Sequence, residues 1–205
     1  MNLKKLVTAA VCTMLMAAVA FTAGCGGEKK SDKKVLKVGM ECAYAPYNWS
    51  QTKADGGAVK IAGSNEYAYG YDVMMAKKLA DSMGADLEIH KIEWDGLAPA
   101  VVSGKIDAAI AGMSITSKRK ETVDFTKPYY YATVVALVKK DSEQAKAQSV
   151  ADLKGSVATS QLNTIWYDQI DQVPDVKKLP AIDTVPGMIV ALTSGKCNLI
   201  VTDIP

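Results

Sequence analysis

A twelve-residue segment occurs twice in this chain, and this repeat constrains the fold more than any other feature. Residues 96–107 align without gaps with residues 187–198, and five of the twelve positions are identical. In each copy an apolar helical segment ends at a glycine and a buried strand is expected to follow. Such helix-glycine-strand turns also look alike in unrelated proteins, which is the alternative explanation. Because there is no third copy, we interpret the repeat as two lobes of one plan rather than as a solenoid.

Short strands and helices alternate through the first half of the chain. We expect strands at residues 35–39, 87–89 and 106–110, with helices at residues 71–83 and around 97–101. The longer helix has apolar residues three and four positions apart, as a half-buried helix requires. This order predicts βαβ units and therefore an α/β fold.

The N-terminus has the composition of an export signal. Two lysines precede an apolar run over residues 6–21, which is too short to span a bilayer comfortably. The sequence Thr-Ala-Gly-Cys at residues 22–25 resembles a lipobox, the cleavage site of bacterial lipoproteins, with Thr22 where Leu is usual. We expect a signal peptide at 1–24 and a lipid anchor on Cys25. The alternative is an ordinary secretory signal whose cleavage site contains a cysteine.

The remaining chain divides into a tether and two lobes. Residues 25–34 are polar and charged and are expected to form a flexible tether. The β-branched segment 133–138 is long enough to lead from one lobe into the other, so we place lobe 1 at 35–133 and lobe 2 at 134–205. Without the signal, basic and acidic residues number 22 each, and nothing indicates binding to nucleic acid.

The sequence has few residues suited to covalent or metal chemistry. It contains a single histidine and no phosphate-binding loop, dinucleotide fingerprint or metal-ligand cluster, so we expect no cofactor, no metal and no nucleophilic catalysis. Cys42 and Cys197 are either a disulfide of an exported protein or two separate thiols.

Polar residues follow the strand expected at 106–110. Ligands of open α/β sheets bind beyond the carboxyl ends of the strands. There, Gly112 allows close approach to the main chain, Ser114 offers a hydroxyl, and Arg119 can hold a carboxylate through two hydrogen bonds. Asp203 follows the second copy of the repeat and would pair with an ammonium group. Together these residues predict a cleft that neutralises both charges of an amino acid.

Several short motifs, in this order, carry a resemblance to a known family. They are residues 39–47, 70–73, 94–97, 103–108, 111–119 and 123–129. The chain resembles the amino-acid-binding family of extracytoplasmic solute-binding proteins, which supply polar-amino-acid ABC transporters. The resemblance implies a two-lobed, periplasmic-binding-protein-like fold of type II. Because the family continues beyond the point equivalent to Pro205, the resemblance implies that the second lobe and the hinge return are incomplete.

The resemblance also implies roles for individual residues at the backbone end of an amino acid. Arg119 would hold the α-carboxylate, helped by main-chain N–H groups near Gly112 and Thr164, where a helix is expected to begin. Ser114 and Asp203 would hold the α-ammonium group.

The other end of the ligand involves three further residues. Tyr44 and Trp94 would sandwich the ligand side chain and Glu41 would face its far end, where an acid often accompanies cationic side chains in the family. The segment 160–164 departs from the family's commoner Gly-Thr-Thr pattern, so contacts from it are the least defined.

We therefore expect a monomeric, lipid-anchored, extracytoplasmic protein that captures a polar amino acid and delivers it to a permease by hinge closure. Arginine, lysine and glutamine are all compatible with the sequence. Two alternatives stay open. One is an enzyme on the same fold, similar to cyclohexadienyl dehydratase, which would need a cleft carboxylate with a raised pKa. The other is the ligand-sensing module of a receptor.

Overall fold

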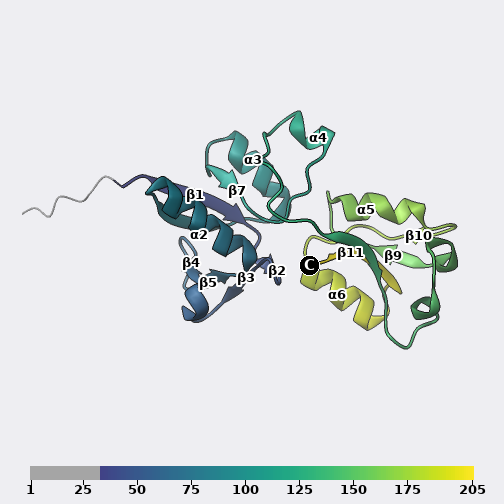
Figure 1. Ribbon diagram of the computed structural model, residues 1–205. Helices are drawn as coiled ribbons and strands as arrows, with labels where there is room; N and C mark the ends of the chain where they lie inside the picture. Colours follow the sequence, from purple (N-terminus) through teal and green to yellow (C-terminus); the bar gives the residue numbers. More distant parts are fainter. Residues whose placement is uncertain (1–32) are drawn as a thin grey trace, which may run out of the picture. The chain divides into compact units, whose positions relative to one another are not determined.

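Three β-sheets organise residues 33–205, the part of the chain that the computed structural model describes (Figure 1). The expected signal peptide, Cys25 and all but the end of the tether lie outside the described residues. None of the helices among residues 33–205 is both long and apolar enough to cross a membrane.

The first sheet is parallel and has the strand order β6-β1-β7. It consists of β1 (Val35–Met40), β6 (Asp86–Lys91) and β7 (Ala108–Ala109). Helix α2 (Tyr71–Met83) leads to β6 and helix α3 (Leu97–Val102) leads back across β1 to β7. Because parallel crossovers are right-handed and these two run in opposite directions, the helices cover opposite faces of the sheet (Figure 1).

A small antiparallel sheet is inserted between β1 and α2. Its order is β2-β3-β5-β4, with β2 (Ala43–Tyr44), β3 (Asn48–Gln51), β4 (Val59–Lys60) and β5 (Tyr67–Tyr69). These strands have two to four residues and lack a clear alternation of apolar and polar residues, so the sequence did not predict them.

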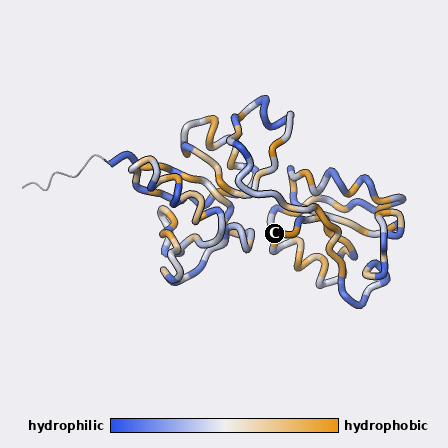
Figure 2. Tube along the Cα trace, in the orientation of Figure 1, coloured by the Kyte–Doolittle hydropathy of each residue, from blue (hydrophilic) through white to orange (hydrophobic). Residues whose placement is uncertain are grey.

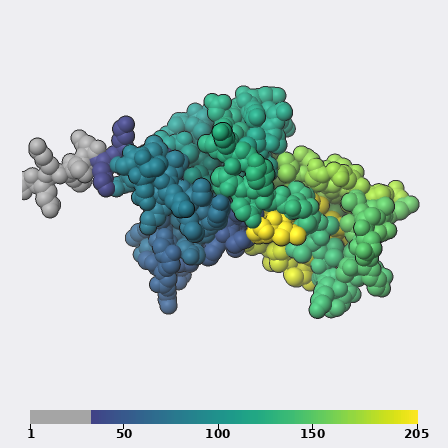
Figure 3. All heavy atoms as spheres, viewed as in Figure 1, coloured from purple at the N-terminus to yellow at the C-terminus, as the bar shows by residue number. Residues whose placement is uncertain are grey.

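The third sheet has the order β10-β9-β11-β8. Strands β9 (Val157–Thr159), β10 (Lys177–Lys178) and β11 (Leu199–Ile204) are parallel, and β8 (Thr133–Leu137) pairs antiparallel with β11. Helix α5 (Ile165–Gln169) and helix α6 (Val185–Ser194) lie on opposite faces of this sheet (Figure 1). The end of β11 lies at the surface, where its atoms are yellow in Figure 3. Short helices complete the description: η1 (Asp55–Gly57), η2 (Trp94–Gly96), α4 (Ser117–Lys120), η3 (Glu143–Lys146), η4 (Val150–Leu153) and η5 (Ile170–Gln172).

The repeat seen in the sequence is a repeat of structure. The order β1-α2-β6-α3-β7 matches β9-α5-β10-α6-β11, and the strand orders β6-β1-β7 and β10-β9-β11 correspond. The match extends to side chains, since Asp107 Oδ2 accepts a hydrogen bond from Lys37 N and Asn198 Oδ1 accepts one from Val157 N, both at 2.8 Å. The interpretation of the repeat as one plan used twice is thus confirmed.

Most of the expected elements are present, with local differences. Helix α2 has the expected bounds and ends at Gly84, whose φ of 62° is left-handed. Two of its apolar residues, Leu79 and Met83, nevertheless lie on the outer face and are 40% and 55% exposed. The strand expected at 106–110 is confined to β7, although Ile106 is buried. Helix α6 is apolar over most of its length (Figure 2), and its outer residue Val190 is 63% exposed.

Two clusters of buried side chains form the core. One cluster contains residues of β1, α2 and β6, and the other contains residues of β9, β11 and α6. Tyr44 and Tyr47 belong to the second cluster, although they lie early in the chain. Cys42 and Cys197 are buried in different clusters, and both are free thiols. The lobe boundary at residues 133 and 134 stays a prediction.

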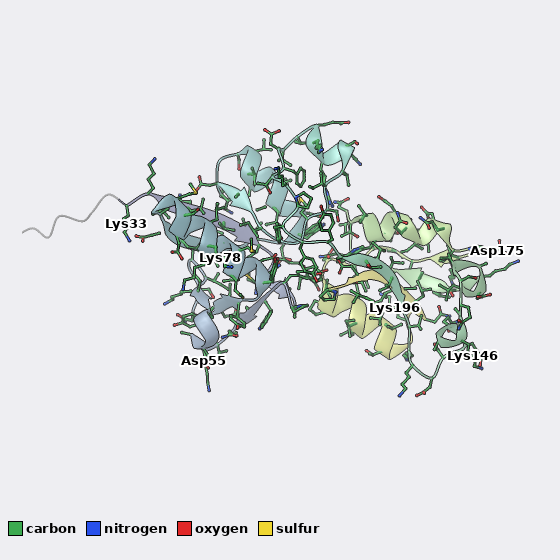
Figure 4. All side chains as sticks on the ribbon, viewed as in Figure 1. Lys33, Asp55, Lys78, Lys146, Asp175 and Lys196 are labelled. Atoms are coloured by element: carbon green, nitrogen blue, oxygen red, sulfur yellow. The ribbon has the colours of Figure 1, made fainter. Side chains whose placement is uncertain are left out.

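Charged side chains of both signs lie at the surface. Figure 4 shows Asp55, Lys146 and Asp175 pointing away from their elements. Lys146 pairs with Glu143 at 2.9 Å and Asp175 pairs with Lys154 at 3.1 Å, and these four side chains are at least two-thirds exposed. Such exposed pairs contribute little to stability.

Candidate functional site

Four segments far apart in the sequence line one small pocket. They are the turn after β1, the start of η2, the loop after β7 and the start of α5. Seven of the eight predicted ligand-binding residues are among its lining: Glu41, Tyr44, Trp94, Gly112, Ser114, Arg119 and Thr164. The space between them is about 10 Å³, which holds no more than one water molecule.

Arg119 is fixed by contacts at both of its ends. It lies on α4, where its backbone N–H donates to the side chain of the N-cap residue Thr116. Its guanidinium donates from Nη1 to Ser114 O at 2.7 Å and from Nη2 to Asn163 O at 2.8 Å. The guanidinium carbon also lies 5.4 Å from the centre of the Trp94 ring, a cation–π distance. Burial lowers the pKa of Arg119, but a guanidinium remains charged near neutral pH.

Asn163 occupies the centre of this arrangement. Its carbonyl oxygen accepts from Arg119 Nη2 and also from Trp94 Nε1, at 3.4 Å. Its side chain donates to Asp95 Oδ1 at 3.0 Å, and its φ of 54° is left-handed. The Asn163 carbonyl therefore accepts a hydrogen bond from Arg119, the residue predicted to hold a ligand carboxylate. No sequence motif predicts this contact, because Asn163 lies in the segment that departs from the family pattern.

Glu41 is a buried carboxylate whose side chain hydrogen-bonds to an amide. The residue is 4% exposed, and Gln161 Nε2 donates to its two oxygens at 3.0 and 3.2 Å. Burial raises the pKa of Glu41 above its ordinary value of 4.5, and the Gln161 hydrogen bond opposes that effect in part. Gln161 also donates to Asp183 O at 2.9 Å, so its amide is held in place.

The aromatic residues make contacts other than the predicted sandwich. Tyr44 packs against Tyr47 and Trp166, with ring centres 4.7 and 5.6 Å apart. Its hydroxyl donates to Asp203 Oδ1. Trp94 faces the Arg119 guanidinium instead of Tyr44. Both predicted aromatics line the pocket, and the sandwich of a ligand side chain between them stays a prediction.

Asp203 lines a second, larger cavity. This cavity has a volume of about 290 Å³ and is bordered by residues 125–132 together with Tyr47, Trp166 and Asp203. Gly112 and Ser114 border both cavities. Burial raises the pKa of Asp203, while the hydrogen bond from Tyr44 opposes the rise. Asp203 thus lies in the neighbouring cavity together with Ser114, and their shared role toward an ammonium group stays a prediction.

The two backbone positions predicted to bind the carboxylate differ. Thr164 begins helix α5 as predicted, since its hydroxyl oxygen accepts from Tyr167 N at 3.3 Å and the hydroxyl donates to Gln161 O at 2.7 Å. Gly112 N–H, in contrast, donates to the Tyr129 hydroxyl at 3.0 Å and is not available to a ligand in this conformation.

Three residues that contact the site loops were not predicted as site residues. Asp72, Asn48 and Tyr129 connect the loops through hydrogen bonds around the buried Asp72. Asp72 and Tyr129 lie in two of the motifs that carry the family resemblance, 70–73 and 123–129, and this was the available signal. Among residues 33–205, no group of three His, Cys, Asp or Glu side chains could hold a metal ion.

Comparisons with known proteins identify the family to which the chain is related. The family described as bacterial extracellular solute-binding proteins, family 3, matches residues 36–179. The chain is 30% identical over 197 residues to ABC transporter arginine-binding protein 1 of Escherichia coli (strain K12), covering 96% of this chain and 70% of that protein. It is 33% identical over 140 residues to the arginine-binding extracellular protein ArtP of Bacillus subtilis (strain 168), covering 68% of this chain and 49% of ArtP.

A solved structure shows the same fold. The ancestral amino acid-binding protein AncCDT-1, a precursor of cyclohexadienyl dehydratase, superposes with a TM-score of 0.70 at 32% identity. The match covers 82% of this chain and 70% of that structure. The expected α/β fold of the two-lobed, type II periplasmic-binding class is confirmed. The chain therefore belongs to the bacterial extracellular solute-binding proteins of family 3.

Proposed function

We propose that this chain captures a cationic amino acid, with L-arginine as the first candidate, and delivers it to the permease of an ABC transporter. The observation that carries the proposal is the pairing, in one pocket, of a partly buried guanidinium at Arg119 with a buried carboxylate at Glu41. An amino acid with a cationic side chain has an α-carboxylate that can pair with Arg119 and a side-chain cation that can pair with Glu41. The names of two relatives, both arginine-binding, support the same choice.

The α-carboxylate would replace the Asn163 carbonyl. Arg119 Nη2 and Trp94 Nε1 already converge on that one oxygen, and a carboxylate makes stronger, charge-assisted hydrogen bonds than a neutral carbonyl. The main-chain N–H groups at the start of α5 would add to this. Ser114 and Asp203 remain the proposed partners of the α-ammonium group, and Asp203 would have to exchange its contact with Tyr44.

Binding requires movement because the pocket is too small for an amino acid. The segment 160–164 contacts Glu41, Trp94, Asp95 and Arg119. We propose that this segment separates from Arg119 to admit the ligand and then closes on it, with β8 and its flanking residues as the hinge. Small-angle scattering profiles that stay the same on addition of a tightly binding ligand would contradict closure.

The cellular setting is also a proposal. The export signal and the lipobox-like residues support a lipid anchor on Cys25 in a monomer held outside the cytoplasmic membrane. Palmitate labelling of the full chain and of a Cys25→Ser variant tests it, since only the full chain would incorporate label.

One observation favours an enzyme as the second candidate. Burial raises the pKa of two site carboxylates, Glu41 and Asp203, and a general acid in a dehydration needs such a shift. The AncCDT-1 likeness gives the reaction type to test. Formation of an aromatic product from a cyclohexadienyl substrate, followed by ultraviolet absorbance, would support it.

A thermal-shift screen against the common amino acids tests the main proposal. A ligand that binds only the folded chain raises its melting temperature, by an amount that grows with ligand concentration above Kd. We expect the largest rise with L-arginine and a smaller one with L-lysine. A cooperative melt that no amino acid shifts would refute capture.

A further inference from the structure

We infer that Asp72 is a positioning residue that holds both ligand-contacting loops through one hydrogen-bond network centred on its buried carboxylate. The network links the turn after β1, which carries Glu41 and leads directly into β2 with Tyr44, to the loop after β7, which carries Gly112 and Ser114. Asp72 touches neither the pocket nor a ligand, and it acts through the backbones of these loops.

The burial of Asp72 requires an explanation that its helix does not provide. The residue is 0% exposed, and the hydrogen bonds of its carboxylate come from two neutral side chains. Asn48 Nδ2 donates to Oδ2 at 2.7 Å and the Tyr129 hydroxyl donates to Oδ1 at 2.7 Å. Burying a carboxylate beside neutral donors costs free energy. For this reason the pKa of Asp72 is raised, mainly by its burial. A polar or apolar residue would fill the position at lower cost unless the acceptor oxygens were needed.

Each of the two partners of Asp72 holds one loop. Asn48 Oδ1 accepts from Cys42 N at 2.8 Å, and the Tyr129 hydroxyl oxygen accepts from Gly112 N at 3.0 Å. Both amides therefore end a chain of hydrogen bonds whose middle is the Asp72 carboxylate. A carboxylate only accepts, so it fixes the direction of both chains: Asn48 and Tyr129 must donate to it, and each then has an oxygen free to accept from a loop.

The two loop residues at the ends of the network share an unusual backbone. Cys42 has a φ of 57° and Gly112 a φ of 65°, both left-handed. For Cys42 this conformation is costly, and for both residues it turns the chain sharply beside pocket residues. Strained conformations persist only where neighbouring contacts hold them, and here the same carboxylate holds both.

The start of helix α2 is built to bring Asp72 to this position. Asp72 N donates to Tyr47 O at 2.8 Å and Tyr71 N donates to Pro46 O at 3.2 Å. A Cβ atom on Gly70 would lie 2.3 Å from Tyr47 O, so only glycine permits this approach. The Gly-Tyr-Asp motif thus has a physical explanation. Gly70 allows the close approach to the Tyr47 backbone, and this approach places the Asp72 carboxylate next to Asn48 and Tyr129.

A Tyr129→Phe variant tests the inference because it removes a single oxygen. The matched control is Tyr71→Phe, which removes the same atom from a ring 6.1 Å away and deletes a hydrogen bond to Tyr129 O. The readout is the solvent-exchange rate of the Gly112 and Cys42 amide protons, measured by NMR on the chain without added ligand. We expect Tyr129→Phe to speed exchange at Gly112 by about three- to tenfold, the value of one hydrogen bond, and Tyr71→Phe to leave it unchanged. Asp72→Asn should speed exchange at both amides.

Affinity for L-arginine gives a second readout, which rests on the proposed function. Tyr129→Phe and Asp72→Asn should weaken L-arginine binding by more than Tyr71→Phe does. The comparison is made after the affinities are corrected for any difference in melting temperature between the variants. If wild-type protein does not bind L-arginine, the exchange rates still decide the inference. Equal exchange at Gly112 in Tyr129→Phe and Tyr71→Phe would overturn it.

Discussion

Glu41 gives the sharpest test of ligand selectivity. We expect Glu41→Gln to weaken binding of L-arginine while leaving L-glutamine binding within about threefold, the effect of about 0.6 kcal/mol. The variant keeps the shape of the side chain, and its amide oxygen can still accept the hydrogen bond from Gln161 Nε2. The negative charge and one of the two acceptor oxygens are lost while the shape is kept, so the fold around the pocket should persist.

The size of the effect follows from the burial of Glu41. Its carboxylate is 4% exposed, so a guanidinium that reaches it makes charge-assisted hydrogen bonds shielded from solvent. Such bonds are worth about 1.5–3 kcal/mol, which corresponds to a Kd about 10- to 150-fold higher in the variant. Isothermal titration calorimetry at pH 7.5 with both amino acids measures it.

The control is Glu93→Gln. Glu93 is exposed and lies near enough to raise the pKa of Glu41 slightly, so neutralising it tests a general loss of negative charge. We expect little change in Kd for either ligand, because solvent screens the exposed charge. Arginine binding that is unaffected in Glu41→Gln, or glutamine binding that falls equally, would refute the assignment of Glu41 to the far end of the ligand.

Further predictions concern pH, Arg119 and Gly112. Since burial places the pKa of Glu41 above 4.5, L-arginine should bind more weakly as pH falls through that raised value, and titrations should show a flatter dependence in Glu41→Gln. The folding stability of the free protein should depend on pH in the opposite direction. Because the pKa of Glu41 is raised in the folded state, its carboxylate lowers the free energy of unfolding as pH rises. The Glu41→Gln variant lacks this charge and should therefore melt at a higher temperature than the wild type at pH 7.5. Arg119→Met should weaken every amino acid about 100-fold or more, because the α-carboxylate is common to all, whereas Lys118→Met on the same helix should not. Gly112→Ala should lower the melting temperature, since its φ of 65° disfavours a side chain and the new Cβ would lie 3.2 Å from Tyr44 Cε1.

The fold was largely predictable from the sequence because its main elements are periodic or repeated. Helix α2 carries its own stop signal in Gly84, and the repeated segment fixed the placement of α3 and α6. The small sheet β2-β3-β5-β4 was missed because strands of two to four residues have too few positions to show alternation. These short strands are stabilised by contacts with residues distant in the sequence, and a local sequence pattern does not indicate such contacts.

The candidate site was predictable residue by residue but not contact by contact. Seven predicted residues line one pocket because each follows a strand end or opens a helix, positions that the topology gathers at one edge. The sequence could not show that the Asn163 carbonyl accepts from Arg119 and Trp94, because a backbone oxygen has no residue type to signal it. Nor could it show that Gly112 N–H is taken by Tyr129, a residue 17 positions later.

The repeat explains why Glu41 meets Gln161. Val38 pairs with Ala108 in the first sheet, and Ala158 pairs with Leu199, the residue equivalent to Ala108, in the second. Residues three positions beyond Val38 and Ala158 are therefore equivalent, and these are Glu41 and Gln161. Their hydrogen bonds join two copies of one position across the pocket. Two identical acids there would repel each other in a buried space, whereas an acid and an amide attract, so the site required the two copies to diverge. The copy that carries the charge is the one that also supplies Arg119. The α-carboxylate and the cationic side chain of the ligand are therefore expected to lie against the first half of the chain, with Asp203 of the second half beside the α-ammonium group.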